Sequence, residues 1–138
     1  MDMAHIEQSG TNNESYTIQN GDNHTANTFQ IGSNNTSTIT QIGAIGGTNS
    51  GLIGHTATMT QFGLDNVGTI YQEGQNNEAT IYQEGVGNEA IISQTVSNNT
   101  ALVSQIGNNN YGSIEQHSTG NVDTIVQSGN NNTYSIVR

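Results

Sequence analysis

The chain has 138 residues, of which only 30% are hydrophobic and 9% charged, and it contains no Pro, Cys or Trp. A composition dominated by Asn, Gly, Thr, Ser and Gln leaves little apolar area for a conventional core and is typical of polar segments that stay disordered or aggregate. The net charge of −10, with a single cationic residue, argues against nucleic acid and anionic membrane surfaces as partners.

The chain carries no recognisable targeting or membrane segment. Its start, "MDMAHIEQSG", lacks the basic residues and apolar run of a secretory signal. This is consistent with a cytosolic protein and equally with a mature secreted chain behind an added Met. No apolar stretch is long enough to cross a bilayer, so no membrane insertion is expected. We expect residues 1–3 to be start or leader residues and 4–138 to form a single domain.

Glutamine recurs at a fixed interval along the whole chain. Twelve are present, and apart from Gln75 and one longer step, each follows the previous one by eleven residues. Leu52 and Arg138 stand where two further members would fall, which gives thirteen positions, with the unit after Leu52 shortened by two residues. The glutamines on this register are Gln8, Gln19, Gln30, Gln41, Gln61, Gln72, Gln83, Gln94, Gln105, Gln116 and Gln127.

Each of these positions is predicted to end a short β-strand. A small residue usually stands four before it and an aliphatic residue two before it, and the alternate positions hold residues such as Thr, Ser, Tyr and Glu. This period of two is typical of a strand with one buried face. In chain order the expected strand segments are 4–8, 15–19, 26–30, 37–41, 48–52, 57–61, 68–72, 79–83, 90–94, 101–105, 112–116, 123–127 and 134–138.

The residues between these segments predict tight turns. Gly follows the register position by two in most units, and Asn follows it by five; both residue types tolerate the positive φ that a tight turn needs. Each unit of eleven residues is therefore one strand and one turn. The Asn positions are Asn13, Asn35, Asn66, Asn77, Asn88, Asn99, Asn110, Asn121 and Asn132.

A strand this short cannot bury its own face, so the units must stack. Two units make one coil. We therefore predict an all-β fold: a β-solenoid of about six coils, with two parallel sheets stacked face to face in a cross-β, amyloid-like arrangement. Residues two units apart would lie one above the other at about 4.8 Å.

Stacking explains why glutamine can occupy a buried position. A buried carboxamide is costly alone but satisfied in a ladder, where it donates to one neighbour and accepts from the other. The spacing predicts one unbroken ladder through Gln19, Gln41, Gln61, Gln83, Gln105 and Gln127. It predicts a second ladder, broken at Leu52 and at its end, through Gln8, Gln30, Leu52, Gln72, Gln94, Gln116 and Arg138.

The pattern Gln-x-Gly-x-x-Asn-x-Ala-x-x-x-Gln, intact from Gln72 to Gln83 and from Gln83 to Gln94, resembles the curlin repeat, and the likeness covers nearly the whole chain. Curlins are the secreted subunits of curli, the extracellular amyloid fibres of bacterial biofilms. The resemblance implies a β-solenoid subunit that leaves the cell through a dedicated outer-membrane pore, its signal peptide removed, and self-assembles outside. Departures from the pattern are the shortened turn after Gly54, Asp123 and Tyr134 at small-residue positions, and the lack of a long polar leader.

No catalytic, cofactor or metal site is expected. Glu73 and Glu84 lie in adjacent units that face opposite sides of the coil, so they predict a solvated surface rather than an acid–base pair. His24 and His55 both occupy the Asn turn position but follow strands of opposite predicted sheets, so we do not expect them to stack. His5 and His117 are isolated, and metal sites need converging ligands. Asn-x-Ser/Thr triplets such as Asn98-Asn99-Thr100 follow from composition.

The sequence bears on three other functions. A polysaccharide-cleaving solenoid enzyme would gather ionisable residues on one face, and nothing here does so. An ice- or surface-binding solenoid would show matched outward Thr columns; Thr38, Thr40, Thr58 and Thr60 suggest one, but Tyr71, Tyr82, Ser93, Ser104 and Glu115 interrupt it. A minor, nucleating subunit is the alternative within the family. Ladders that continue to the last residue, with no basic final repeat, favour the bulk subunit, serving biofilm matrix and adhesion, with a nucleator as a partner.

The two ends of the solenoid are predicted to join subunits head-to-tail, because neither end carries a capping repeat. The predicted interface consists of Ala4, Ile6, Gln8, Tyr134, Ile136 and Arg138. Thirteen strands would place seven in one sheet and six in the other, so successive subunits would be related by half a revolution and a rise of about 31 Å; twelve strands would remove the half turn. Asp123 is expected to act as an unpaired buried charge that slows assembly.

Overall fold

The computed structural model describes residues 1–43 and 54–138, which form twelve β-strands. Most of the strands begin immediately after a turn Asn or His and continue beyond the glutamine of the eleven-residue register. They are β1 (Met3–Thr11), β2 (Glu14–Asn20), β3 (Thr25–Ser33), β4 (Thr36–Gly43), β5 (Thr56–Leu64), β6 (Val67–Gly74), β7 (Glu78–Val86), β8 (Glu89–Gln94), β9 (Thr100–Asn108), β10 (Tyr111–Gln116), β11 (Val122–Asn130) and β12 (Thr133–Val137).

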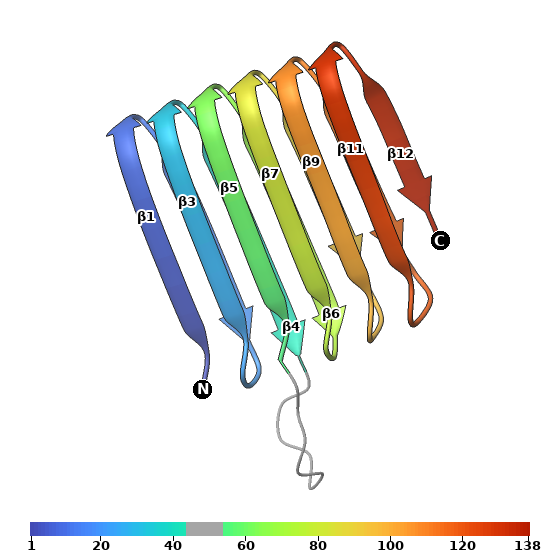
Figure 1. The fold of residues 1–138 in the computed structure, drawn as a ribbon. Coiled ribbons are helices and arrows are strands. Elements are labelled where there is room, and N and C mark those ends of the chain that lie inside the picture. The colour runs from blue at the N-terminus through green and yellow to red at the C-terminus, as the bar shows by residue number, and fades with distance from the viewer. Residues whose placement is uncertain (44–53) are drawn as a thin grey trace, which may run out of the picture.

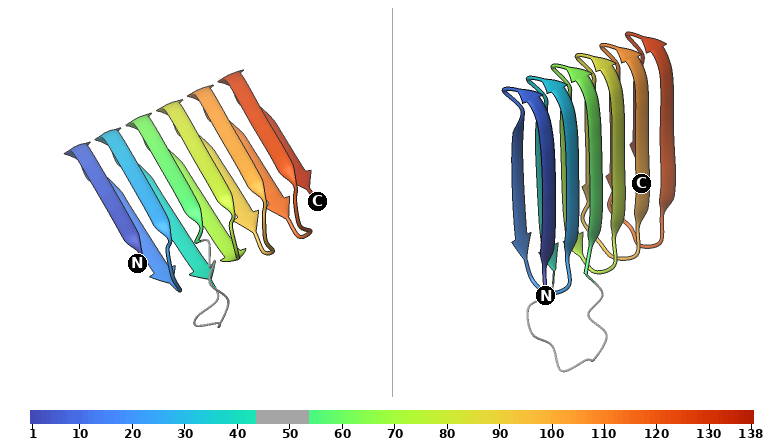
Figure 2. Two further views of the ribbon diagram at one scale, coloured as in Figure 1. Left: turned by 60° about the horizontal axis from the view of Figure 1, so that its bottom comes forward. Right: turned by 60° about the vertical axis from the view of Figure 1, so that its left-hand side comes forward.

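The strands form two parallel sheets of six strands each, in the orders β1-β3-β5-β7-β9-β11 and β2-β4-β6-β8-β10-β12. The chain passes from one sheet to the other at every turn, so two consecutive strands make one coil and the coils stack from the N-terminal to the C-terminal end (Figures 1 and 2). We call these the odd-strand sheet and the even-strand sheet. The predicted β-solenoid of about six coils with two parallel sheets is confirmed.

Equivalent residues stack in strict register, but not along the ladders that the sequence predicted. Gln30 pairs with Gln61 and Gln41 with Gln72, steps of 31 residues where every other rung spans 22. The prediction that Gln41 stacks on Gln61 is therefore wrong. The strand expected at 48–52, with Leu52 in its ladder, lies outside the described residues. β3 pairs directly with β5, and β4 pairs directly with β6, so no strand stands between the members of either pair.

The described residues form twelve of the thirteen predicted strands. The described residues supply six strands to each sheet, so the solenoid consists of whole coils and the expectation of a leftover half coil loses its basis. β1 already begins at Met3, within the segment expected to be a leader. None of the elements in the described ranges is a helix long and apolar enough to span a bilayer.

The core lies between the two sheets. Burial alternates along most inner strands, as in β7, where Ala79, Ile81 and Gln83 are buried and the residues between them are partly exposed. Small, aliphatic and carboxamide side chains thus form three columns on each sheet. The buried apolar residues are Ala26, Ile39, Ala57, Met59, Ile70, Ala79, Ile81, Ala90, Ile92, Ala101, Val103, Ile114 and Ile125.

Two positions in each regular turn have positive φ. The fourth residue after each glutamine is left-handed wherever the turn is described and is always Asn, Asp or Gly, the residues that tolerate this conformation. Two residues after Gln83, Gly85 has φ 125°, and a Cβ there would lie 1.9 Å from the carbonyl oxygen of Gly107 in the next coil. Glycine is required because the coils approach closely at this edge.

Candidate self-assembly surfaces

Carboxamide ladders run through both sides of the core. In the odd-strand sheet the Nε2 group of each glutamine donates to the Oε1 atom of the next, from Gln8 through Gln30, Gln61, Gln83 and Gln105 to Gln127. In the even-strand sheet the corresponding bonds join Gln19, Gln41, Gln72, Gln94 and Gln116 at 2.9 to 3.0 Å. Every one of these amides donates toward the C-terminal coil, so both ladders have a direction.

Asparagine columns run along the turns in the opposite sense. At one edge each backbone N–H donates to the side-chain Oδ1 atom of the preceding coil at 3.0 to 3.1 Å. These side chains also donate to backbone carbonyls across the turn; Asn66 Nδ2, for example, donates to the oxygens of Phe62 and Gly85 at 3.1 Å. The column consists of Asn13, Asn35, Asn66, Asn88, Asn110 and Asn132.

The column at the other edge contains two histidines. The rings of His24 and His55 stack with centroids 4.9 Å apart and an interplanar angle of 7°. The prediction that these residues do not pair is wrong, because it rested on the ladder assignment through Leu52. With β3 directly on β5, both histidines lie at the same turn of consecutive coils. The column consists of Asp2, His24, His55, Asn77, Asn99 and Asn121.

The hydrogen bonds of the histidine pair select one tautomer. His24 Nδ1 accepts the backbone N–H of His55 at 3.0 Å, and His55 Nδ1 accepts that of Asn77 at 3.2 Å. Each Nε2 atom faces a backbone carbonyl, that of Asn20 or Ile42. The pKa of the His55 imidazole is lowered, mainly by burial and also by the nearby His24. Hydrogen bonds to the backbone carbonyls of Ile42 and Gly74 raise this pKa but do not outweigh the burial. The neutral ring therefore serves in place of an asparagine.

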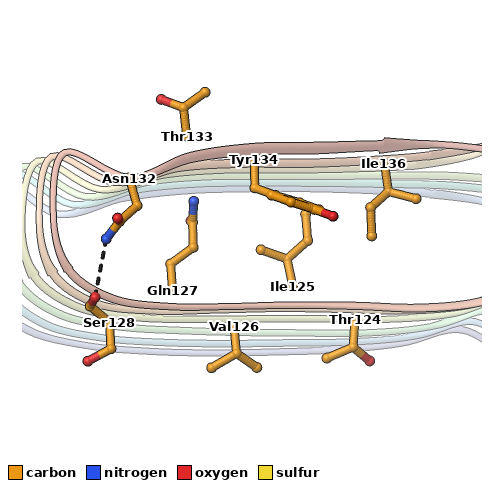
Figure 3. A pocket seen from close by; sticks show the side chains of 9 residues that line it. All are labelled: Thr124, Ile125, Val126, Gln127, Ser128, Asn132, Thr133, Tyr134 and Ile136. Carbon is orange, nitrogen blue, oxygen red and sulfur yellow. Dashed lines mark hydrogen bonds between the residues drawn. The ribbon is translucent and has the colours of Figure 1, made fainter.

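The C-terminal end of the solenoid is open. Strands β11 and β12 each pair with a strand on one side only. Between them lies a hollow of about 460 Å³. Figure 3 shows the side chains of Ile125, Gln127, Tyr134 and Ile136 pointing into it, while Thr124, Val126 and Thr133 point outward. The columns of core side chains therefore end at β11 and β12 without a further coil packed on them.

The N-terminal end of the solenoid is also open, because strands β1 and β2 each pair with a strand on one side only. Strand β1 is exposed along its whole length, and Ile6 is 44% exposed although its equivalents in the inner coils are buried. In β2 the hydroxyl oxygens of Ser15 and Thr17 are shielded from solvent and have no hydrogen-bond partner. Gln8 and Gln19 present Oε1 acceptors here, because the ladders donate away from this end.

Comparison with known families decides the identity of this repeat. The model of the curlin associated repeat matches residues 56–85, 63–95 and 74–107, which cover strands β5 to β9. Residues 56–107 therefore consist of curlin associated repeats. The curlin family consists of structural fibre subunits and is not a family of enzymes. No curated protein matches the chain.

The last coil of this curlin-repeat protein departs from the repeat at Asp123 and Arg138. Asp123 stands where the preceding coils carry alanine, and it is not the unpaired charge that the sequence predicted. Its Oδ2 atom accepts from Gln116 Nε2 at 2.8 Å, and its Oδ1 atom accepts from Arg138 Nε at 3.1 Å. Arg138 lies fifteen residues away in sequence, at the position where a glutamine would continue the ladder.

The remaining candidate residues of the curlin-repeat protein lie on its surface. Glu73 and Glu84 project from different sheets, and each accepts a hydrogen bond from a tyrosine two residues earlier, which raises the pKa of Tyr71 and Tyr82. His5 and His117 are exposed beside Glu7 and Glu115. In the described part of the chain, no three His, Cys, Asp or Glu side chains gather as a metal ion would require.

Outward threonines do not form a long column. Stacked residues on the outer face of the even-strand sheet read Tyr16, Thr38, Thr69, Ile91, Ser113 and Ser135. This mixture lacks the regular lattice of hydroxyl and methyl groups that an ice-binding surface would need. The arrangement therefore favours the ends of the curlin-repeat solenoid, rather than its faces, as the functional surfaces.

Proposed function

We propose that this protein is a structural subunit of an extracellular, curli-like amyloid fibre on the bacterial surface, serving biofilm matrix and adhesion. Subunits join head-to-tail, so that β1 and β2 of one copy continue the sheets of β11 and β12 of the copy before it. The proposal rests on one observation about the two ends of the solenoid. Each end leaves two strands paired on one side only, and both ends carry the same columns of residues. A bare sheet edge recruits another strand, and two unlike ends produce a filament rather than a closed dimer.

Continuing the register pairs Ile6 with Ile125 and Gln8 with Gln127 across the junction, because these residues occupy the same columns. The hydrogen-bonding groups are complementary in the same arrangement. Gln127 ends its ladder as a donor and Gln8 begins it as an acceptor, while Asn132 offers Oδ1 to the backbone N–H of Asn13. Two N-terminal ends placed together would instead bring carboxamide oxygens against each other.

Whole coils set the expected geometry of the fibre. Six strands per sheet at about 4.8 Å give a rise of about 29 Å per subunit, with no half turn between successive copies. Fibre diffraction should show the inter-strand spacing along the fibre axis, and helical reconstruction should show the rise. Lateral or antiparallel contact between subunit ends in the reconstruction would reject the head-to-tail arrangement.

Two complementary variants test the junction directly. Ile6→Asp damages only the N-terminal end and Tyr134→Asp only the C-terminal end, and both residues are exposed in the single chain, at 44% and 58%. A buried, unpaired carboxylate costs roughly 3 to 5 kcal/mol, which weakens the junction about a hundredfold or more. Each variant alone should remain monomeric, because every junction needs both ends.

A mixture of the two variants should form heterodimers and stop there, since the intact end of each fits the intact end of the other. Mass photometry with one variant carrying a mass tag distinguishes heterodimers from homodimers. Circular dichroism of each variant must first show the strand content of the parent chain. Homodimers in either single solution would show like ends meeting, and a parent chain that stays monomeric at high concentration would reject the fibre itself.

A further inference from the structure

The last coil contains a paired replacement of two core residues. In the odd-strand sheet Ala4, Ala26, Ala57, Ala79 and Ala101 form a column that Asp123 ends, and in the even-strand sheet Arg138 ends the column of glutamines. The Asp123 side chain is 5% exposed and that of Arg138 is 58% exposed, and they form an ion pair at 3.1 Å. In the last coil an acid and a base in contact thus stand where the inner coils have an alanine and a glutamine.

This pair changes how the even-strand ladder ends. Gln116 Nε2 donates to the Asp123 carboxylate rather than to a further carboxamide. Both carboxylate oxygens therefore have a partner, and Oδ1 accepts the hydrogen bond from the Nε atom of the guanidinium. A guanidinium has five N–H donors, and the other four remain on a half-exposed group at the open end of the solenoid. The odd-strand ladder, in contrast, ends in the neutral carboxamide of Gln127.

The position of the next copy follows from the contacts of the inner coils. In each coil the even-strand glutamine donates to the carbonyl of the first odd-strand residue; Gln19 donates to Met3 at 2.9 Å and Gln116 to Thr100 at 3.1 Å. In the proposed fibre the same column places Gln19 of the incoming copy directly over Arg138. Asp2, the residue before Met3, enters the turn column next to it.

Charge and hydrogen bonding are complementary at this point. Arg138 is the only Lys or Arg in a chain of net charge −10, so the net charges of two copies repel each other. The incoming coil offers the Oε1 acceptor of Gln19 and the carboxylate of Asp2, whose Oδ1 atom accepts from the backbone of His24 in its own subunit. Planar guanidinium groups bind carboxylates with defined geometry.

We propose that Arg138, held in place by Asp123, is the specificity-determining residue of the subunit junction and binds Gln19 and Asp2 of the incoming copy. This inference rests on the proposed head-to-tail fibre. Between inner coils the side chains at the glutamine position form neutral amide ladders, so the junction differs from them in containing an ion pair at this position. It accepts the N-terminal coil of a second copy and repels a second C-terminal end, where two guanidinium groups would meet.

The experiment measures the concentration of soluble chain in equilibrium with fibres, which reports the affinity of the junction. Asp2→Asn removes the charge of Asp2 but keeps its oxygen for the bond to His24. This variant should raise the soluble concentration about fivefold or more. Asp22→Asn is the matched control, because Asp22 is an exposed acid in the turn of the first coil and does not meet Arg138; it should leave the concentration unchanged or lower it through reduced repulsion.

The decisive comparison uses Asp123→Ala with Arg138→Gln, which restores the regular columns. Fibres of this double variant should form, and adding Asp2→Asn to it should have no effect on the soluble concentration. Each single change, Asp123→Ala or Arg138→Gln, should raise that concentration above the value for the double variant. An equal effect of Asp2→Asn in both backgrounds would overturn the proposed contact. Absence of fibres from the parent chain would instead reject the proposed function.

Discussion

His24 and His55 stack with parallel rings whose centroids lie 4.9 Å apart, although 31 residues separate them in the chain. They occupy two positions of a turn column whose following members are Asn77, Asn99 and Asn121. Each ring accepts a backbone N–H at Nδ1, so protonating that atom removes an acceptor from a buried turn. In His55 the column therefore contains a buried ring whose protonation would break the hydrogen bond to the backbone of Asn77.

The first prediction concerns pH. The pKa of His55 in the folded chain lies below its ordinary value of 6.5, so the unfolded chain takes up the proton first. The free energy of unfolding should be level above about pH 6.5 and fall as the pH drops below it, by at most about 1.4 kcal/mol per pH unit for one proton. Urea unfolding of unassembled chain between pH 5 and 7 measures the slope. The slope should decrease in His55→Asn and persist in His5→Asn, which alters an exposed histidine.

The second prediction concerns the glutamine ladder. Gln83→Glu places a carboxylate between two buried carboxamides, and the expected loss is roughly 3 to 5 kcal/mol of unfolding free energy. Gln75→Glu changes the net charge equally at an exposed position off the register and should alter stability by no more than about 0.5 kcal/mol. Urea titrations of the two variants give the comparison. Equal losses would show that the ladder contributes nothing specific.

The third prediction concerns the close approach of the coils at glycine. Gly85→Ala would place a methyl group 1.9 Å from a backbone oxygen at a φ of 125°, so we expect a loss of about 3 kcal/mol or more. Gly120→Asn is the control, since the position has φ 77° with open space around it and other turns carry Asn there. Thermal unfolding should show the control within about 0.5 kcal/mol of the parent chain. Tolerance of Gly85→Ala would mean that the coils are further apart than the structure places them.

The fourth prediction concerns the turn asparagines. Asn66→Ala removes the acceptor of the Asn88 backbone N–H and leaves that donor buried, which should cost about 2 kcal/mol or more. Asn27→Ala alters an outward-facing side chain of β3 and should cost less than about 0.5 kcal/mol. Hydrogen exchange should also speed up at Asn88 in the first variant and not in the second. Unchanged protection at Asn88 would contradict the role of the column.

The sequence by itself determined the strands, the turns and the inward-facing residues. Alternation with a period of two selects the buried face of a strand, and Gly or Asn after it provides the backbone freedom for a turn; both effects act within a few residues. The recurrence of eleven residues then required stacking, because no single unit buries its own face. Ala79, Ile81 and Gln83 could be placed in the core on this basis alone.

Only the tertiary structure decided which coils lie on each other where the spacing is interrupted. The interval of eleven residues predicted Leu52 as a member of a ladder and Gln61 as the neighbour of Gln41. In the structure Gln41 stacks directly on Gln72. A longer connection costs little closure entropy, but a missing rung would leave buried carboxamides without partners. The direct pairing of β3 with β5 also places His24 on His55. The contact of Asp123 with Arg138 likewise depends on two sheets meeting across the core, a relation that a repeat of eleven residues along one chain does not specify.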